Sequence, residues 1–249
     1  MATDRMRYGI FGDIHGNYDA LQAVLESLEK EQVDVLICLG DVVGYGAEPR
    51  ECIAKVKELG CVVLAGNHDH AAIERLDVEF FNAFAKQAAL WTRSQLTDED
   101  KSFLASLGFV DHHEHFACVH GSLHGPELFN YIATIFDAEL SFEALDKPVL
   151  FYGHTHIPLT FFDTTPMTFT MENEIRITSD MKALVNVGSV GQPRDEDPRA
   201  SFAVYEQVDS TGEGVVRIHR IPYDVSAASR KIVAAGLPEP LAIRLELGK

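Results

Sequence analysis

The first 64 residues alternate short apolar runs with amphipathic segments, and this order restricts the chain to a small set of folds. Apolar runs at residues 8–11, 33–39 and 61–64 are predicted strands. The stretch that follows the N-cap Asn17 and the stretch 51–59 repeat apolar residues at helical spacing, which predicts two helices. A strand–helix–strand–helix–strand order predicts a largely parallel sheet in an α/β fold.

The rest of the chain changes character twice. A helical insert is predicted at about 70–107, and apolar strands follow at 116–119 and 149–152. The stretch from about 159 to 223 is rich in Thr, Val, Ile and Phe and carries a turn signal at 209–212; it predicts antiparallel strands that form a second sheet stacked on the first. A tail at about 225–249 predicts two short helices. Because no linker or repeat interrupts the sequence, residues 1–249 are predicted to form a single domain.

Five short segments place Asp, Asn or His directly after an apolar strand. They are Gly12-Asp13-Ile14-His15-Gly16-Asn17, Gly40-Asp41, Gly66-Asn67-His68-Asp69, His120-Gly121 and Gly153-His154-Thr155-His156. Strand ends in an open α/β sheet share the edge where ligands bind. We therefore expect seven side chains to converge there: Asp13, His15, Asp41, Asn67, His120, His154 and His156.

These residue types favour a metal site. Carboxylate and amide oxygens and imidazole nitrogens suit Mn²⁺, Fe, Zn²⁺, Ni²⁺ or Mg²⁺. Seven ligands are too many for one tetrahedral ion and fit two ions that share a carboxylate. In an extended segment, Asp-x-His and His-x-His place both side chains on one side. Each motif alone also has a structural interpretation as a turn or a surface pair, but their shared position at strand ends favours two metal ions.

The net charge of the chain limits the kinds of molecule that it is expected to bind. The sequence has 21 basic and 38 acidic side chains, which gives a formal net charge of −17 at pH 7. This charge makes nucleic acid and anionic membranes unfavourable partners, so phosphate binding would need local positive charge, which a bound metal supplies. Charged residues at the start, Asp4, Arg5 and Arg7, replace the apolar stretch of a signal peptide, and no apolar run is long enough to span a bilayer. A cytoplasmic location is the resulting expectation.

The four cysteines form no CxxC pair and are predicted free thiols.

Taken together, the five segments resemble the signature of the calcineurin-like metallophosphoesterases. The later Asn186-Val187-Gly188-Ser189 resembles the continuation of that family. The resemblance implies a four-layer αββα sandwich of two stacked mixed β-sheets with a dinuclear site at its edge. It implies that one ion is held by Asp13, His15, Asp41 and His156, and the other by Asp41, Asn67, His120 and His154, so that Asp41 bridges. It further implies that His68 is a catalytic histidine and that Asp69 orients it.

Two departures indicate the branch of the family. Protein Ser/Thr phosphatases have arginines near the second and third motifs, where this chain reads Asp41-Val42-Val43-Gly44-Tyr45-Gly46 and Leu64-Ala65-Gly66. The sequence is more similar to the small bacterial and archaeal phosphodiesterase-like branch. We therefore expect a metal-dependent hydrolase of phosphodiesters in small phosphorylated substrates. The expected cofactors are two divalent ions per chain, Mn²⁺ first. The oligomeric state stays open.

The expected mechanism is attack on phosphorus by a hydroxide that bridges the two ions, with His68, at a pKa near the working pH, assisting the leaving group. Phosphomonoesterase or nucleotide pyrophosphatase activity at the same site is the first alternative. A nuclease and a non-catalytic metal-binding scaffold are weaker alternatives, because the chain is acidic and because it retains all seven ligands and His68.

Three residues are candidate substrate contacts. The amide of Asn67 has an NH₂ left for a hydrogen bond to substrate. Arg194 is a candidate phosphate ligand, or else forms a salt bridge with Asp195, Glu196 or Asp197 in its own loop. Tyr45 either stacks on an aromatic group of the substrate or packs at the rim. The aromatic group Phe80, Phe81, Phe84 and Trp91 is interpreted as helical core rather than as a substrate site.

Overall fold

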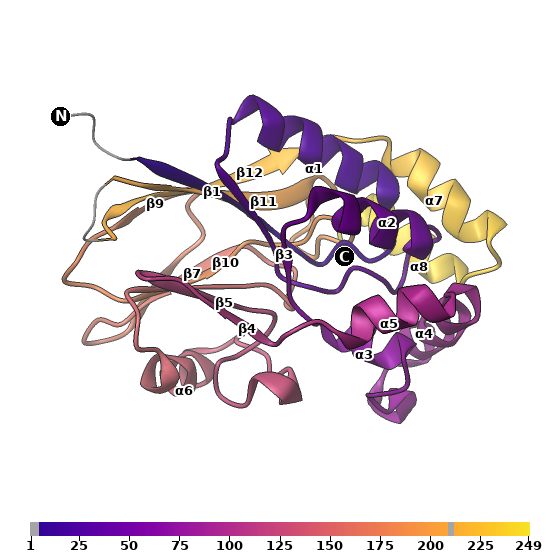
Figure 1. The fold of residues 1–249 in the computed structure, drawn as a ribbon, viewed down its shortest axis with the longest axis horizontal. Coiled ribbons are helices and arrows are strands. Elements are labelled where there is room, and N and C mark those ends of the chain that lie inside the picture. The colour runs from indigo at the N-terminus through magenta and orange to yellow at the C-terminus, as the bar shows by residue number, and fades with distance from the viewer. Residues whose placement is uncertain (1–4, 209–211) are drawn as a thin grey trace.

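Two six-stranded sheets form the centre of the computed structural model, which describes residues 5–208 and 212–249. The first sheet has the order β3-β2-β1-β11-β12-β9, with strands Val62–Val63, Val35–Cys38, Met6–Phe11, Ala200–Gln207, Gly214–Ile221 and Glu174–Ile177. The second has the order β4-β5-β6-β10-β7-β8, with strands Val110–His112, Phe116–Val119, Val149–Tyr152, Ala183–Asn186, Leu159–Phe162 and Thr168–Thr170. Figure 1 shows the two sheets stacked, with helices outside both.

Both sheets are mixed, as the resemblance implied. Strands β1, β2 and β3 pair in parallel, and so do β5, β6 and β10, whereas the other pairings are antiparallel. Strands β1 and β2 of the first sheet are apolar on both faces: Ile10 and Ile37 pack between the sheets, and Phe11 and Cys38 pack under the outer helices. Because successive strand residues point to opposite faces, an unbroken apolar run is required in a layer covered on both sides.

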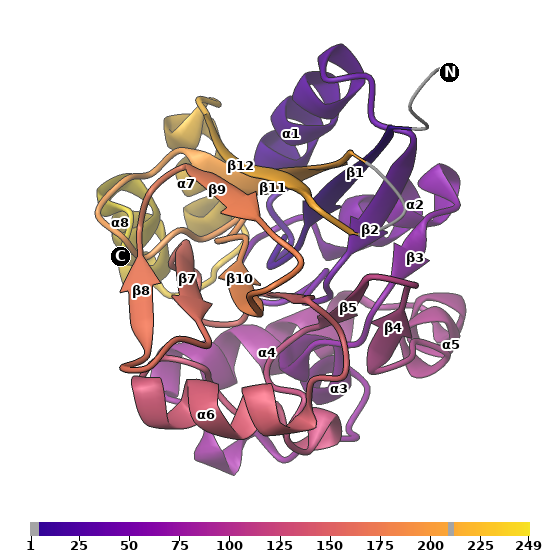
Figure 2. The ribbon, with the colours of Figure 1, turned by 90° about the vertical axis from the view of Figure 1, so that its left-hand side faces the viewer.

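The first outer layer consists mainly of helices α1, Tyr18–Lys30, α2, Pro49–Leu59, and α7, Val225–Ala234. Asn17 caps α1 as predicted, since its side chain accepts a hydrogen bond from the amide of Ala20. Gly60 ends α2 with a positive φ of 60°. On the opposite side, α6, Ile135–Ala144, covers the second sheet (Figure 2). These layers confirm the predicted αββα sandwich.

The stretch 159–223 corrects one expectation, because it does not form one sheet. Strands β7, β8 and β10 join the second sheet, whereas β9, β11 and β12 join the first. Strand β11 pairs with β1 and sends Phe202 toward the outer helices and Tyr205 between the sheets. Residues 209–211 of the predicted turn at 209–212 lie outside the described residues.

The helices of the middle region and of the tail pack on each other. The middle region holds α3, Asn67–Ala72, the short 3₁₀ helix η1, Val78–Phe80, α4, Ala83–Gln95, and α5, Asp98–Ala105; a second 3₁₀ turn, η2, spans Pro126–Leu128. Ala88 of α4 shares an apolar cluster with Ile232 of α7 and with Leu241 of α8, Glu239–Leu247. The single domain expected from the sequence stays a prediction, and this contact between distant segments favours it.

None of the described helices is both long and apolar enough to cross a membrane. All four cysteines are free.

Candidate metal centre

Four strand ends and the start of α3 bring the seven predicted ligands to one edge of the sandwich. Asp13 and His15 follow β1, Asp41 follows β2, His120 follows β5, and His154 and His156 follow β6. Asn67 is the first residue of α3. All of these side chains are buried. The convergence expected from the sequence is therefore present in the structure.

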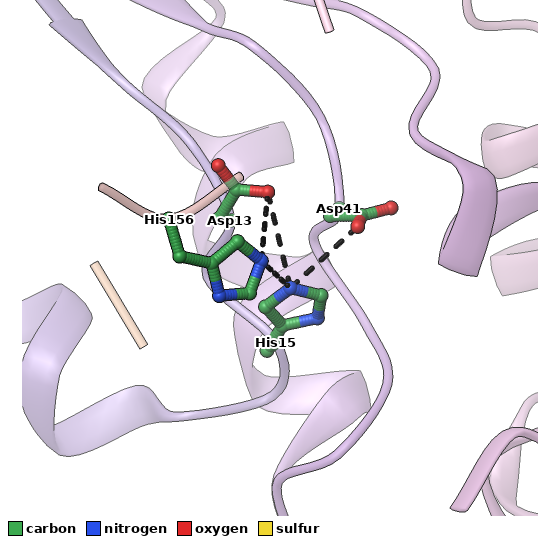
Figure 3. A group of neighbouring side chains, drawn as sticks. All are labelled: Asp13, His15, Asp41 and His156. Carbon is green, nitrogen blue, oxygen red and sulfur yellow. Dashed lines mark hydrogen bonds and ion pairs between the residues drawn. The ribbon is translucent and has the colours of Figure 1, made fainter. Parts of the chain in front are cut away.

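The first group contains Asp13, His15, Asp41 and His156 (Figure 3). The Nε2 atoms of His15 and His156 lie 3.0 Å apart. Asp13 Oδ1 is 3.4 Å from His156 Nε2, and Asp41 Oδ2 is 3.5 Å from His15 Nε2. One candidate atom from each residue thus faces a common point.

The second group shares Asp41 with the first and adds His120 and His154. Its centre is His120 Nε2, which lies 3.4 Å from Asp41 Oδ2 and 3.1 Å from His154 Nδ1. The Asn67 side-chain oxygen is 3.2 Å from the same nitrogen. Asp41 therefore stands between two clusters of ligand atoms.

The tautomers of three histidines show why these clusters suit a cation. The Nδ1 atoms of His15, His120 and His156 each face a backbone carbonyl, at 3.1, 3.0 and 2.6 Å. Each Nδ1 must therefore donate its hydrogen, so that in the neutral form of each ring the lone pair is on Nε2. These lone pairs point at each other and at carboxylate oxygens, an arrangement that a divalent cation stabilises.

Two buried carboxylate oxygens support the same fit. Asp13 Oδ2 accepts a hydrogen bond from the amide of His154, and Asp41 Oδ1 accepts one from the amide of His68. The other oxygens, Asp13 Oδ1 and Asp41 Oδ2, are buried and have no hydrogen-bond partner in the described residues. An unpaired buried anionic oxygen is unfavourable, so both atoms are suited to bind metal.

The backbone of the ligand loops corrects the geometry expected for Asp-x-His and His-x-His. Asp13, His15, Asp41, His154 and His156 all have positive φ, between 50° and 68°, and lie in loops rather than in extended segments. Positive φ at a residue other than glycine costs about 1 kcal/mol or more. Asp13 and His15 nevertheless share a group, whereas His154 and His156 belong to different groups.

Small and polar neighbours hold these loops in place. A Cβ on Gly66 would clash with Asp41, and one on Gly153 would clash with Asp13, so both positions require glycine. The Asn186 side chain donates to the carbonyl of Gly153, and the Ser189 hydroxyl donates to the carbonyl of Asp13. The segment that continued the family resemblance therefore braces two ligand loops.

The protonation states suit metal binding. Burial lowers the pKa of His15, His154 and His156, which keeps these rings neutral. At His120 burial acts in the same direction, but the Asp41 carboxylate outweighs it and raises the pKa to about 9. A cation between His120 and Asp41 would take the place of that proton.

Two expectations about His68 and Asp69 need correction. The Asp69 carboxylate accepts hydrogen bonds from the amides of Gly66 and Val43, and it ties two ligand loops together. It does not orient His68, whose Nδ1 has no partner within the described residues. The His68 ring is instead packed against Tyr45 and Phe81, with ring centroids 4.4 and 4.9 Å away. Burial lowers the pKa of His68 to about 4, which makes the ring neutral at pH 7 rather than half-protonated.

Arg194 lies beside the first group, and no carboxylate of the described residues pairs with it. In the described part of the chain, the three acidic residues of its loop pair with other cations: Asp195 with Arg220, Glu196 with Lys249, and Asp197 with Arg199. Arg194 Nη2 donates to the Tyr45 hydroxyl and to Gln192, at 3.3 and 2.8 Å, and its Nε is buried without a partner. The alternative of a salt bridge within the loop is therefore wrong.

Tyr45 is buried against His15, with ring centroids 4.7 Å apart. The sequence reasoning missed Tyr131, whose ring stacks on His154 with centroids 3.9 Å apart. The feature of the sequence that could have indicated Tyr131 as a site residue was its position in the loop after His120.

Comparisons with known proteins agree with this geometry. Residues 6–210 match the model of the calcineurin-like phosphoesterase superfamily domain. The uncharacterized protein MJ0912 of Methanocaldococcus jannaschii is 34% identical over 244 residues, which cover 96% of this chain and 97% of that protein. The crystal structure of a metallophosphoesterase from Sphaerobacter thermophilus has a TM-score of 0.87 at 38% identity, covering 99% of this chain and 100% of that chain.

A shorter similarity concerns a nucleotide hydrolase. The symmetrical bis(5'-nucleosyl)-tetraphosphatase of Psychromonas ingrahamii is 44% identical over 63 residues, which cover 24% of this chain and 23% of that enzyme.

The family match and the similarity along nearly the whole chain place this protein in the calcineurin-like phosphoesterase superfamily. It is a hydrolase that acts on phosphoester bonds, and its buried Asp and His groups are fit to bind metal.

Proposed function

We propose that the protein is a phosphodiesterase that uses two divalent metal ions. The single observation that carries this proposal is the position of Asp41, whose Oδ2 faces both clusters of ligand atoms. Asp13, His15, Asp41 and His156 would hold one ion; Asp41, Asn67, His120 and His154 would hold the other. When bound, two such ions ionise a water near neutral pH and neutralise the phosphoryl oxygens of the substrate. The mixed nitrogen and oxygen ligands suit Mn²⁺, and also Fe, Zn²⁺ or Ni²⁺.

The surrounding residues orient the substrate in this proposal. Within the described residues no carboxylate pairs with Arg194, so its guanidinium is suited to bind a substrate phosphate oxygen. The neutral His68 ring lies 4.9 Å from His15, between centroids, and its N–H donates a hydrogen bond to the oxygen that leaves phosphorus. Asn67 turns its side-chain oxygen toward His120 and keeps its NH₂ for the substrate.

A nucleotide pyrophosphatase is the second candidate. The similarity of a 63-residue stretch to a bis(5'-nucleosyl)-tetraphosphatase favours it, because that enzyme's name describes hydrolysis of a phosphate chain between two nucleosides. The same metal ligands and the same Arg194 would serve either reaction. The formal charge of −17 argues against a nuclease.

Substrate profiling of the Mn²⁺-reconstituted protein tests the proposal. We expect hydrolysis of bis(p-nitrophenyl) phosphate to exceed hydrolysis of p-nitrophenyl phosphate. Turnover of P¹,P⁴-di(adenosine-5′) tetraphosphate without turnover of the diester would favour the pyrophosphatase. Hydrolysis of the monoester alone would contradict both.

A further inference from the structure

A cleft beside the proposed metal centre is lined largely by aromatic and apolar side chains. Its volume is about 430 Å³, and it shares Asn67, His68 and His154 with the site described above. This volume lies in the range of about 300–1,000 Å³ that is typical of small-molecule sites. A phosphoester that reaches the metal centre from this side therefore has room for a bulky substituent.

Three large apolar side chains in the lining are strongly exposed. Phe80, at the end of η1, is 91% exposed; Leu128, in η2, is 65% exposed; and Tyr131 is 53% exposed. Single exposed apolar residues are ordinary on a protein surface. Here, however, exposed apolar side chains from two separate segments line the same cleft next to the metal centre. The interpretation as helical core is therefore wrong for Phe80, and also for Phe84, which is 42% exposed; Phe81 and Trp91 pack against an apolar cluster.

The cleft also presents flat rings at its inner end. Tyr131 stacks on His154 with an interplanar angle of 18°, and Phe81 packs against His68. Aromatic faces bind other flat rings by stacking, and they accept any nucleobase because every base has a π-face.

The charge of the side chains that line the cleft indicates whether it binds an aromatic ring or a second phosphate group of the substrate. Among the described residues that line the cleft there is no Lys or Arg, whereas Asp77 contributes a carboxylate. Asp77 Oδ1 accepts a hydrogen bond from the amide of Glu79, so this side chain is held in place. Arg194 interacts with the hydroxyls of two lining residues, Tyr45 and Tyr131, so positive charge borders the cleft there. At Asp77 a phosphate would face a carboxylate, whereas the exocyclic amine of a base could donate a hydrogen bond to it.

We propose that this cleft binds the nucleobase of a nucleoside phosphate whose phosphate group lies at the metal centre. The inference rests on the proposed function and adds the class of substrate. Phosphate is recognised by the metal centre and Arg194, and the base is recognised by the rings of the cleft.

The test compares two ligands that differ in the base alone. Adenosine 5′-monophosphate and ribose 5-phosphate are titrated into the Mn²⁺-reconstituted full chain by calorimetry. We expect the Kd of adenosine 5′-monophosphate to be about tenfold lower, because base stacking on an aromatic side chain is strong enough for such a difference. In Phe80→Ala the ratio of the two Kd values should fall to about two or less, while the Kd of ribose 5-phosphate stays unchanged.

A matched control and a second assay separate the possible failures. Phe169 is 59% exposed on β8, outside the cleft, so Phe169→Ala should keep the wild-type ratio. Equal Kd values for the two ligands in wild type, or no binding of adenosine 5′-monophosphate, would overturn the inference. Hydrolysis of bis(p-nitrophenyl) phosphate in the same preparation would then leave the proposed function standing. A tenfold base preference in a protein that binds metal but hydrolyses no phosphoester would support the cleft and overturn the function.

Discussion

The Nε2 atoms of His15 and His156 lie 3.0 Å apart, although 141 residues separate the two histidines in the sequence. Each ring donates its Nδ1 hydrogen to a backbone carbonyl, of Val43 and of Gln192, so two lone pairs face each other. A folded chain holds such lone pairs together only if a cation or a proton lies between them. This relationship ties the fold to metal binding.

Replacement of Asp41 tests the bridge between the two clusters. Asp41→Asn keeps an oxygen for the amide of His68 but removes the charge that faces His15 and His120. We expect metal content to fall by at least one ion per chain and kcat to fall about a thousandfold, since bound metal supplies several kcal/mol of transition-state stabilisation. Elemental analysis and steady-state kinetics measure both. Full metal content with wild-type kcat would disprove the bridging role.

Replacement of His68 separates catalysis from metal binding. His68 does not belong to either group of ligand atoms, so His68→Ala should keep its metal. We expect kcat to fall about 10²- to 10⁴-fold, with the larger loss on substrates whose leaving alcohol has a high pKa. The measurement is the dependence of kcat on leaving-group pKa for a series of aryl and alkyl diesters. An unchanged kcat on the alkyl diester would remove His68 from the mechanism.

Arg194 is predicted to act on substrate affinity. In Arg194→Ala we expect KM to rise about ten- to a hundredfold with little change in metal content, because a charge-assisted contact to phosphate is lost. Arg199 provides the matched control: it lies in the same region, is exposed and pairs with Asp197. If Arg199→Ala raised KM as much as Arg194→Ala, the effect would come from general charge and not from a phosphate contact.

Metal should also stabilise the fold. Its binding neutralises the oxygens of Asp13 and Asp41 that lack a hydrogen-bond partner among the described residues, and it is linked to folding. Saturating Mn²⁺, at about a thousandfold above Kd, contributes about 4 kcal/mol, which corresponds to a rise in Tm of roughly 8–16 °C for a chain of this size. Calorimetric scans of chelator-treated and reloaded protein measure the shift. In Asp41→Asn the shift should shrink, and an equal shift in both proteins would point to metal bound elsewhere.

Local signals explain the parts of the fold that the sequence predicts well. Asn17 and Gly60 mark the ends of helices through the chemistry of single residues, and the apolar run at β2 needs no partner to be recognised. The choice between sheets is different. Strands β10 and β11 are both apolar on both faces, so only their packing decides that one joins β6 and the other joins β1.

The candidate site also has features that the sequence predicts and features that it does not. The identity of its ligands follows from polar residues at strand ends, which the sequence displays directly. The spacing alone does not predict which ligands share a cluster. Asp13 and His15, like His154 and His156, are two residues apart and have positive φ, yet the first pair shares a group and the second pair does not. Nor could the sequence reveal that the Asp69 carboxylate is used by the amides of Gly66 and Val43, because those bonds depend on loops that are distant in the chain.

Anomalous diffraction from crystals grown with Mn²⁺ would locate the bound ions. We expect two peaks per chain, one enclosed by Asp13, His15 and His156 and the other by Asn67, His120 and His154, with Asp41 between them. A single peak, or two peaks that do not both contact Asp41, would contradict the dinuclear centre.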